Sequence, residues 1–270
     1  MNRTTYACIL RACAPALAFR ALLRGRSDAM QGAALWERFG FGYALPPSGV
    51  APVWIHAPAL AETRAAPPLV HRLLERRWPV ILTHTEAAGR REGARLFSPA
   101  IESGHLRQAW LPYDTPGACR RFLEEIAPSC GILLERDVWP TMVHEAKARG
   151  IPMVLASARM SERSARRGRY AGRVLREAYA GLDRVLARTE QDAARLRRCG
   201  ARDVAVCGGL GSDMPNPGDP IAAVPRDAAA RAGAVDSIVR DISQLLAERR
   251  IVPGKVGAVS HSVPALQFLL

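Results

Sequence analysis

Acidic side chains follow, within six residues, two apolar runs that predict buried strands. Glu62 follows the run Val53–His56, and Glu135 and Asp137 follow the run Gly131–Leu134. In an open parallel sheet, ligands bind beyond the carboxyl ends of the strands, so we expect these carboxylates beside the ligand crevice. A carboxylate there can act as a general base. The alternative is that Glu62, in the first turn of a helix, only stabilises that helix.

Hydroxyl and guanidinium groups follow a third apolar run, Pro152–Ala156. The segment Ser157–Ser164 reads SARMSERS. Hydroxyls and arginines at the start of a helix are typical of an anion-binding site. The alternative is that Ser161 caps a helix whose arginines lie on the surface.

Seven short apolar runs alternate with longer segments that have helical character. This alternation predicts a parallel sheet with helices on both faces, and right-handed crossovers make it a doubly wound, Rossmann-like α/β domain. The predicted strands are Val53–His56, Val80–Thr83, Ala109–Pro112, Gly131–Leu134, Pro152–Ala156, Arg184–Ala187 and Val204–Cys207. The predicted helices are Glu62–Arg77, Arg90–Phe97, Pro116–Ile126, Pro140–Arg149, Ser161–Gly181 and Glu190–Cys199.

Three segments are expected along the chain: a membrane-proximal segment at 1–50, the Rossmann-like domain at 51–213, and a linker with an atypical tail at 214–270. The linker is rich in proline from Asp213 to Pro225, which is typical of a domain boundary. Apolar residues at helical spacing predict a helix over Arg226–Arg250.

The N-terminal run Tyr6–Leu23 is mostly apolar and precedes a basic flank. Arg11, Pro15 and Arg20 interrupt it, so it lacks the stretch of about 18 uncharged residues that a membrane span needs. We expect an apolar helix in the cytoplasmic interface of a membrane, with its arginines reaching lipid phosphates. An ordinary apolar helix packed on the domain is the alternative.

The composition excludes some classes of protein and leaves others open. A hydrophobic content of 49% indicates a folded chain of 270 residues. The net charge of +13 favours polyanionic partners, namely nucleic acid, an anionic membrane or phosphorylated substrates, although an arginine-rich composition also supplies charge. The basic residues are dispersed and no nucleic-acid-binding signature is complete, so no nucleic-acid partner is expected. The cysteine and histidine spacings predict neither a metal site nor a disulfide framework.

Six motifs occur in an order that resembles the bacterial 3-deoxy-D-manno-octulosonic acid (Kdo) transferases, from about Tyr6 to Asp213. The motifs are Glu37–Gly40, Val53–Ala66, Leu111–Asp114, Leu133–Pro140, Ser157–Ser164 and Ala187–Ala201. Members of that family are inverting GT-B glycosyltransferases that join Kdo from CMP-Kdo to a lipid A precursor at the inner membrane. The resemblance implies the N-terminal, acceptor-side half of such an enzyme, a transferase of lipopolysaccharide biosynthesis on the cytoplasmic face of that membrane.

The resemblance also implies roles for single residues. Glu62 matches the catalytic base, which takes a proton from a sugar hydroxyl. Arginines in a basic cleft suit an acceptor that carries phosphates. The implied substrate-binding residues are Arg64, Glu135, Asp137, Arg159, Arg163 and Ser164, and neither a cofactor nor a metal is implied.

Departures from the family pattern affect the expected activity. Ala59–Ala61 replaces Ser-Val-Gly, and a Cβ at Ala61 is expected to disturb a close approach or a positive φ. The residues after Asp213 do not resemble the donor-binding domain. We therefore expect a Kdo transferase by descent that is inactive alone. The alternatives are completion of the site by a second chain, or a non-catalytic remnant that binds lipid A or a membrane surface.

Overall fold

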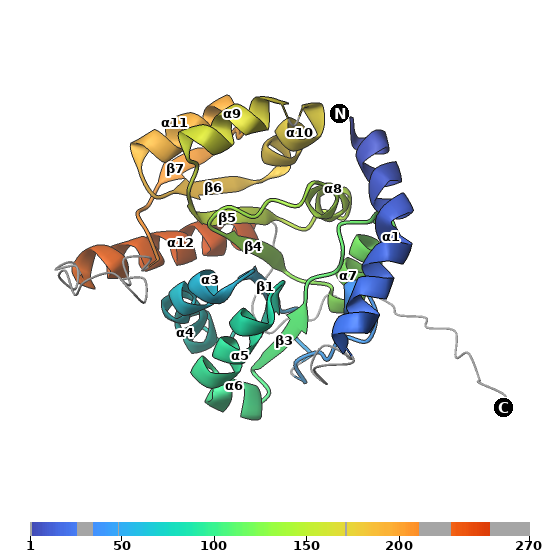
Figure 1. The fold of residues 1–270 in the computed structure, drawn as a ribbon. Coiled ribbons are helices and arrows are strands. Elements are labelled where there is room, and N and C mark those ends of the chain that lie inside the picture. Colours follow the sequence, from blue (N-terminus) through green and yellow to red (C-terminus); the bar gives the residue numbers. More distant parts are fainter. Residues whose placement is uncertain (1, 26–34, 48, 171, 211–227, 249–270) are drawn as a thin grey trace, which may run out of the picture.

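The computed structural model describes residues 2–25, 35–47, 49–170, 172–210 and 228–248 (Figure 1). Seven parallel strands form one sheet in the order β3-β2-β1-β4-β5-β6-β7. The predicted doubly wound α/β architecture is therefore confirmed. The strands are β1 (Val53–His56), β2 (Val80–His84), β3 (Leu106–Trp110), β4 (Cys130–Leu134), β5 (Met153–Ala158), β6 (Arg184–Ala187) and β7 (Val204–Val206).

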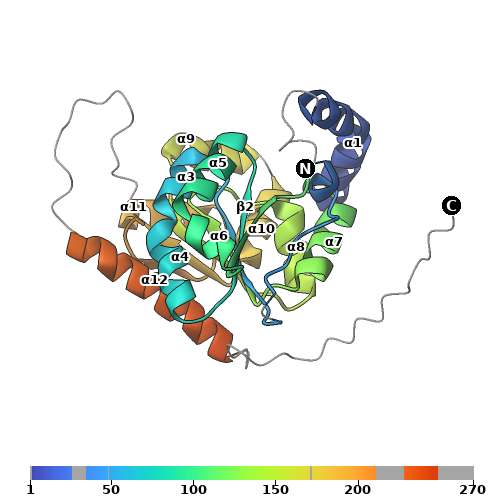
Figure 2. The same cartoon turned by 90° about the horizontal axis from the view of Figure 1, so that it is seen from below.

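Successive strand residues face two separate cores, because side chains alternate across a pleated sheet. In β1, Val53 and Ile55 lie in one core and Trp54 lies in the other. This explains why the central strands are largely apolar on both faces. One face packs on α3 (Leu60–Ala65), α4 (Pro67–Glu75), α5 (Ala87–Leu96), α6 (Ser98–Glu102) and α12 (Ala228–Glu248). The other packs on α7 (Pro116–Ile126), α8 (Pro140–Ala148), α9 (Glu162–Tyr170), α10 (Arg173–Gly181) and α11 (Glu190–Arg198) (Figures 1 and 2).

The strand order reverses between β1 and β4. From β1 the chain winds outward through β2 to β3, and it then returns to pair β4 with the opposite side of β1. A reversal of this kind opens a crevice at the carboxyl ends of the two strands, where the flanking helices leave on opposite faces. The segments after His56 and Leu134 border this crevice.

Several predicted boundaries were wrong. The predicted helix Glu62–Arg77 is two helices, because Pro67 and Pro68 cannot continue α3 and instead begin α4. The predicted helix Ser161–Gly181 is also two, and Gly172 before α10 has a φ of 77°. The predicted strand Ala109–Pro112 is instead Leu106–Trp110.

The segment before β1 docks onto the domain through Glu37 and Arg38. The Glu37 carboxylate accepts hydrogen bonds from the Trp110 amide at 2.5 Å and from Arg90 at 3.2 Å. The Arg38 guanidinium donates to the backbone carbonyls of Leu111 and Thr85. The first of the six motifs therefore holds the segment before β1 against the carboxyl ends of β2 and β3.

Gly40, the last residue of this motif, has a backbone conformation that requires glycine. Its φ is 87°, and an added Cβ would lie 2.4 Å from the carbonyl oxygen of Ala118. We expect Gly40→Ala to destabilise the fold by about 2 to 4 kcal/mol, measured by urea unfolding. Gly42→Ala is the matched control, because Gly42 has a φ of 77° but nothing within 4 Å of an added Cβ. A loss for Gly40→Ala no larger than that for Gly42→Ala would contradict the contact with Ala118.

The N-terminal residues Arg3–Gly25 form helix α1, which lies beside α8 and α10 (Figure 1). The Tyr6 hydroxyl donates to the buried Asp114 carboxylate at 2.9 Å. Ile9 and Phe19 are exposed large apolar side chains of this helix. Within the described ranges, no helix combines the length and the apolar character needed to cross a membrane. The location of α1 in the interface of a membrane stays a prediction.

The tail beyond the sheet contains α12, which packs along α4 through Ile238, Val239 and Ile242. An ion pair between Arg72 and Asp236 at 2.9 Å joins the two helices at the surface. The predicted helix Arg226–Arg250 is confirmed over Ala228–Glu248. The predicted proline-rich linker, Asp213–Pro225, lies outside the described residues.

Candidate active site

Three carboxylates meet at the crevice between β1 and β4. Glu62 lies in the first turn of α3 and is 8% exposed, and Glu135 directly follows β4 and is 4% exposed. Burial raises the pKa of Glu135, and the nearby Glu62 carboxylate raises it further. Burial raises the pKa of Asp137 as well, again with a contribution from Glu62. The structure thus brings together the acids that the sequence placed after two different strands.

Glu135 and Ser157 occupy left-handed backbone conformations at the ends of β4 and β5. Their φ angles are 63° and 53°, although neither is glycine. Each such residue costs about 1 to 2 kcal/mol, so surrounding contacts must hold it. The Arg159 amide donates to the Glu135 carbonyl at 3.0 Å, and the Leu210 amide donates to the Ser157 hydroxyl at 3.2 Å. Strain at two adjacent strand ends is typical of a functional site.

Arginines surround the carboxylates on the β4–β6 side. Arg159 lies 3.5 Å from the Glu135 carboxylate, and its side chain is 48% exposed. The guanidinium groups of Arg159, Arg188 and Arg136 oppose the rise in the pKa of Glu135. An exposed guanidinium beside a buried carboxylate can contact an anionic ligand while it orients the acid.

Arg64 is turned to a different partner. Its Nε donates to Glu92 on α5 at 2.9 Å. Hydrogen bonds from Arg95 and Arg64 hold the pKa of Glu92 at about 2. Ligand binding by Arg64 would have to compete with this ion pair, so its role with substrate stays a prediction.

Ser164 and Arg163 lie in the first turn of α9. The Ser164 amide donates to the Ser161 hydroxyl at 3.1 Å, and the two hydroxyls lie 2.9 Å apart. The alternative that Ser161 caps a helix is therefore confirmed for this segment. Arg163 is exposed, so its guanidinium is accessible to a ligand. The substrate-binding roles of both residues stay predictions.

The last motif, Ala187–Ala201, positions the segment that carries Arg159. Thr189 caps α11 by accepting from the Asp192 amide at 3.1 Å. The Asp192 carboxylate in turn accepts from the Met160 amide at 2.9 Å. The motif, which follows the neighbouring strand β6, therefore holds the loop after β5 in place.

Two charged residues at this site were missing from the sequence-based set. Glu86 stands at the N-cap of α5 and raises the pKa of Asp137. Arg188 follows β6, donates its amide to Ala158 at 3.0 Å, and lowers the pKa of Glu135. Both follow strands of the same sheet, so the rule that located Glu62 could have found them.

The expectation that a Cβ at Ala61 disturbs the backbone before Glu62 was wrong. Ala61 lies inside α3, and it is not among the described non-glycine residues with positive φ. The close approach occurs instead on the facing helix α5, where a Cβ on Gly89 would lie 3.0 Å from the backbone of Ala59. The Ala-Leu-Ala sequence therefore leaves the backbone before Glu62 unstrained.

Four buried polar atoms at the crevice have no hydrogen-bond partner among the described residues. They come from the end of β1, from α3, and from the start of α8 with the residue before it. Such atoms are available to ligand groups or water. They are His56 Nε2, Glu62 Oε2, Trp139 Nε1 and Thr141 Oγ1.

Two histidines beneath the site are buried without charge. Burial lowers the pKa of His56 to about 3 and that of His84 to about 4. Neutral His56 contacts Thr83 through Nδ1 at 2.9 Å, and His84 contacts Gln108 through Nε2 at 2.8 Å. Protonation would place a charge in the core below the crevice.

We expect His56 and His84 to lower the stability of the fold as the pH falls below about 6.5, because each imidazole then binds a proton in the unfolded state but not in the folded state. Each buried histidine contributes a slope of about 1.4 kcal/mol per pH unit until the pH nears its folded pKa. Urea unfolding over this range tests the prediction. His56→Gln should reduce the slope, whereas His71→Gln, at an exposed position, should not. Equal slopes for the two variants would contradict it.

A sequence model of the family described as 3-Deoxy-D-manno-octulosonic-acid transferase (kdotransferase) matches residues 33–214. The 3-deoxy-D-manno-octulosonic acid transferase of Bordetella pertussis is 52% identical over 223 residues, which are 80% of this chain and 51% of that protein. That of Haemophilus influenzae is 34% identical over 174 residues, which are 62% of this chain and 38% of that protein. The chain thus spans about half the length of the first relative.

Among solved structures, a UDP-GlcNAc 2-epimerase from Neisseria meningitidis bound to UDP-GlcNAc is 15% identical, with a TM-score of 0.42. That similarity covers 58% of this chain and 46% of the epimerase. The family match extends over more than half of the chain and includes the segments that carry Glu62, Glu135 and Arg159. The chain therefore belongs to the Kdo transferase family.

Proposed function

We propose that this chain forms the acceptor-side half of a GT-B Kdo transferase, with Glu62 as the catalytic base. The observation that carries the proposal is the meeting of Glu62 and Glu135 at the β1/β4 crevice, within the span that matches the family. Glu62 is buried at a helix start with one carboxylate oxygen free of partners among the described residues. We propose that this oxygen accepts the proton of a sugar hydroxyl when the acceptor enters the crevice.

The proposed reaction transfers Kdo from CMP-Kdo to a lipid A precursor. Glu62 takes the proton of an acceptor hydroxyl, and the hydroxyl oxygen forms a bond to the anomeric carbon of Kdo. The bond from that carbon to the CMP phosphate breaks, and CMP leaves with the electron pair. Glu135 and Asp137 border the same crevice, and Arg159 and Arg163 are placed to contact phosphates of the acceptor.

We propose that the protein works on the cytoplasmic face of the inner membrane, bound at its periphery. Exposed apolar side chains near α1 support this, since Trp36 is 66% and Phe41 is 43% exposed. The Arg121 guanidinium lies 4.2 Å from the centre of the Phe41 ring, so cationic and apolar groups are adjacent. An anionic membrane surface binds such a combination.

Binding of the lipid A precursor to the 270-residue chain tests the acceptor side of the proposal. The acceptor is presented in detergent micelles, and its affinity is compared for wild type, Arg159→Gln and Arg163→Gln. Loss of one charge-assisted hydrogen bond should weaken binding about tenfold or more in each variant. Arg240→Gln, an exposed arginine on α12, is the matched control. Acceptor binding that neither variant weakens relative to this control would contradict the proposed cleft.

The chain alone is proposed to bind the acceptor without transferring sugar, because the relative from Bordetella pertussis is about twice as long as the matched span. The measurement is Kdo transfer by the purified chain supplied with CMP-Kdo and the lipid A precursor. No turnover together with acceptor binding is the expected result. Turnover that Glu62→Ala abolishes would contradict inactivity of the chain alone while supporting Glu62 as the base.

A further inference from the structure

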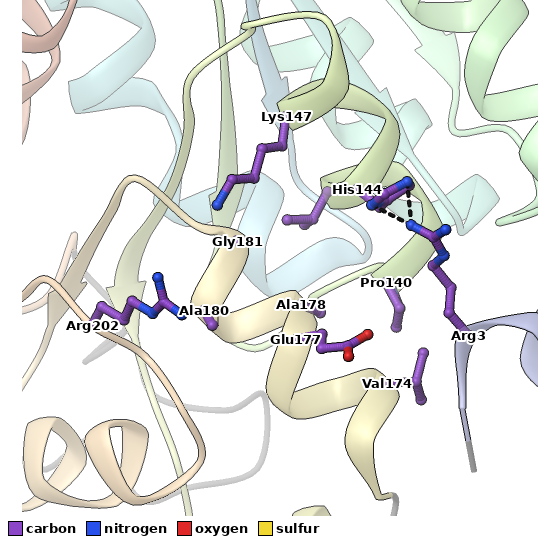
Figure 3. Close-up of a pocket in the computed structure, with 11 residues that line it drawn as sticks. Arg3, Pro140, His144, Lys147, Val174, Glu177, Ala178, Ala180, Gly181 and Arg202 are labelled. Carbon is purple, nitrogen blue, oxygen red and sulfur yellow. Dashed lines mark hydrogen bonds between the residues drawn. The ribbon is translucent and has the colours of Figure 1, made fainter.

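A cavity of about 250 Å³ lies between α8, α10 and the start of α1 (Figure 3). At one end of it, Lys147 from the end of α8 and Arg202 from the turn before β7 flank Gly181. Gly181 ends α10 just before β6 begins. This end therefore lies at the amino edge of the parallel sheet, on the side opposite the carboxylates of the crevice.

Lys147 and Arg202 are uncompensated cations. Both are exposed, and neither side chain has a hydrogen bond or an ion pair with another described residue. Many other arginines of the chain are paired, as Arg149 is with Glu145 at 2.9 Å on the same helix α8. Two cations in one concave site focus a positive field that an anion relieves.

The opposite end of the cavity is polar, and its positive and negative charges are balanced. Arg3 contacts the ring of His144, and the Glu177 carboxylate lies on the same side (Figure 3). Burial and the Arg3 charge lower the pKa of His144, while the carboxylates of Glu145 and Glu177 raise it. Glu177 is itself held by Arg173 at 2.5 Å. Hydrogen-bonding groups with little net charge suit a hydroxylated group, not a second anion.

From this arrangement we propose a binding site for a phosphate monoester, with its phosphate between Lys147 and Arg202 and its organic part directed toward His144. A lysine ammonium and an arginine guanidinium on two sides provide charge-assisted hydrogen bonds to phosphate oxygens. Val143, Val174 and Ala178 also line the cavity and would contact the apolar atoms of the ligand. The site is separate from the crevice and does not depend on Glu62.

Titration of the full chain with inorganic phosphate and with glycerol 3-phosphate, at constant ionic strength, tests the site. Lys147→Gln and Arg202→Gln should each raise the Kd about tenfold. Arg240→Gln, which removes one exposed positive charge from the far face of the sheet, should leave the Kd unchanged. Because Lys147 and Arg202 are exposed, both variants should retain the fold, which circular dichroism verifies.

A second arm identifies the source of the phosphate. Vesicles of phosphatidylcholine with and without phosphatidic acid are floated with the same variants. Loss confined to the soluble esters assigns the site to a free phosphate monoester, and loss confined to phosphatidic acid vesicles assigns it to a lipid headgroup. The competing explanation is that the two cations only stabilise the carbonyl end of α10. In that case both variants lower Tm while binding matches the Arg240→Gln control in both arms, and the site is overturned.

Discussion

Glu62→Gln is expected to lower the rate of Kdo transfer by about 10² to 10⁴, the usual contribution of a general base. The assay uses a hybrid in which residues 33–214 of this chain replace the corresponding part of the Bordetella pertussis relative, 52% identical to it. Glutamine has nearly the volume of glutamate, so the 8% exposed site stays filled while the proton acceptor is lost. The loss should therefore appear in kcat and not in folding.

The control for this substitution is Glu102→Gln, at an exposed position on α6. It removes one negative charge outside the crevice, and its kcat should equal that of the parent hybrid. If Glu62→Gln also retained the kcat of this control, Glu62 would not be the base. A parent hybrid that folds and binds the acceptor but transfers nothing would contradict the wider proposal that this chain supplies a working acceptor half.

Asp114→Asn is expected to cost about 3 kcal/mol of folding stability, since it breaks a buried charged network. The Asp114 carboxylate is 3% exposed and accepts from the amides of Thr141 at 3.0 Å and Met142 at 2.8 Å, which begin α8. It also accepts from the Tyr6 hydroxyl of α1 at 2.9 Å. In asparagine, an NH2 group replaces one of the two carboxylate oxygens, so a hydrogen-bond donor would lie opposite the donors that Asp114 accepts from. The substitution would also remove the negative charge at the N-terminus of α8.

Urea unfolding at neutral pH measures this cost, and Tyr6→Phe provides the graded comparison. It removes one of the four hydrogen bonds that the carboxylate accepts, of which the fourth comes from the Cys119 thiol at 3.6 Å, and should cost about 1 kcal/mol. The difference between the variants then reports the contacts of the carboxylate with the start of α8 and with the Cys119 thiol. Equal costs would show that the carboxylate stabilises α8 no more than it stabilises the contact with α1.

The position of the site could be predicted from the sequence because it depends on few physical rules. Continuous apolar runs identified strands buried on both faces, and parallel strands end at one edge. Glu62 and Glu135 follow two such strands, so both had to lie near that edge. Their adjacency depends on the pairing of β1 with β4, which no local pattern specifies.

What the sequence could not supply depends on contacts between distant segments. The left-handed conformation of Glu135 is held by the amide of Arg159, which arrives from the end of the next strand. Strand ends place Glu86 and Arg188 at the same edge of the sheet, but their proximity to Asp137 and Glu135 depends on the positions of β2 and β6 in the strand order. Pro67 and Pro68 indicate the break between α3 and α4, but the apolar spacing continues across the two prolines and predicts one helix.

The central claim is that Glu62 acts as a base and not as a binding group, and one paired measurement tests it directly. For the hybrid and its Glu62→Gln variant, the acceptor Kd and the single-turnover rate of Kdo transfer are measured on the same preparation. We predict an unchanged Kd with a rate lower by about 10² or more. A weakened Kd with an unchanged single-turnover rate would contradict the claim.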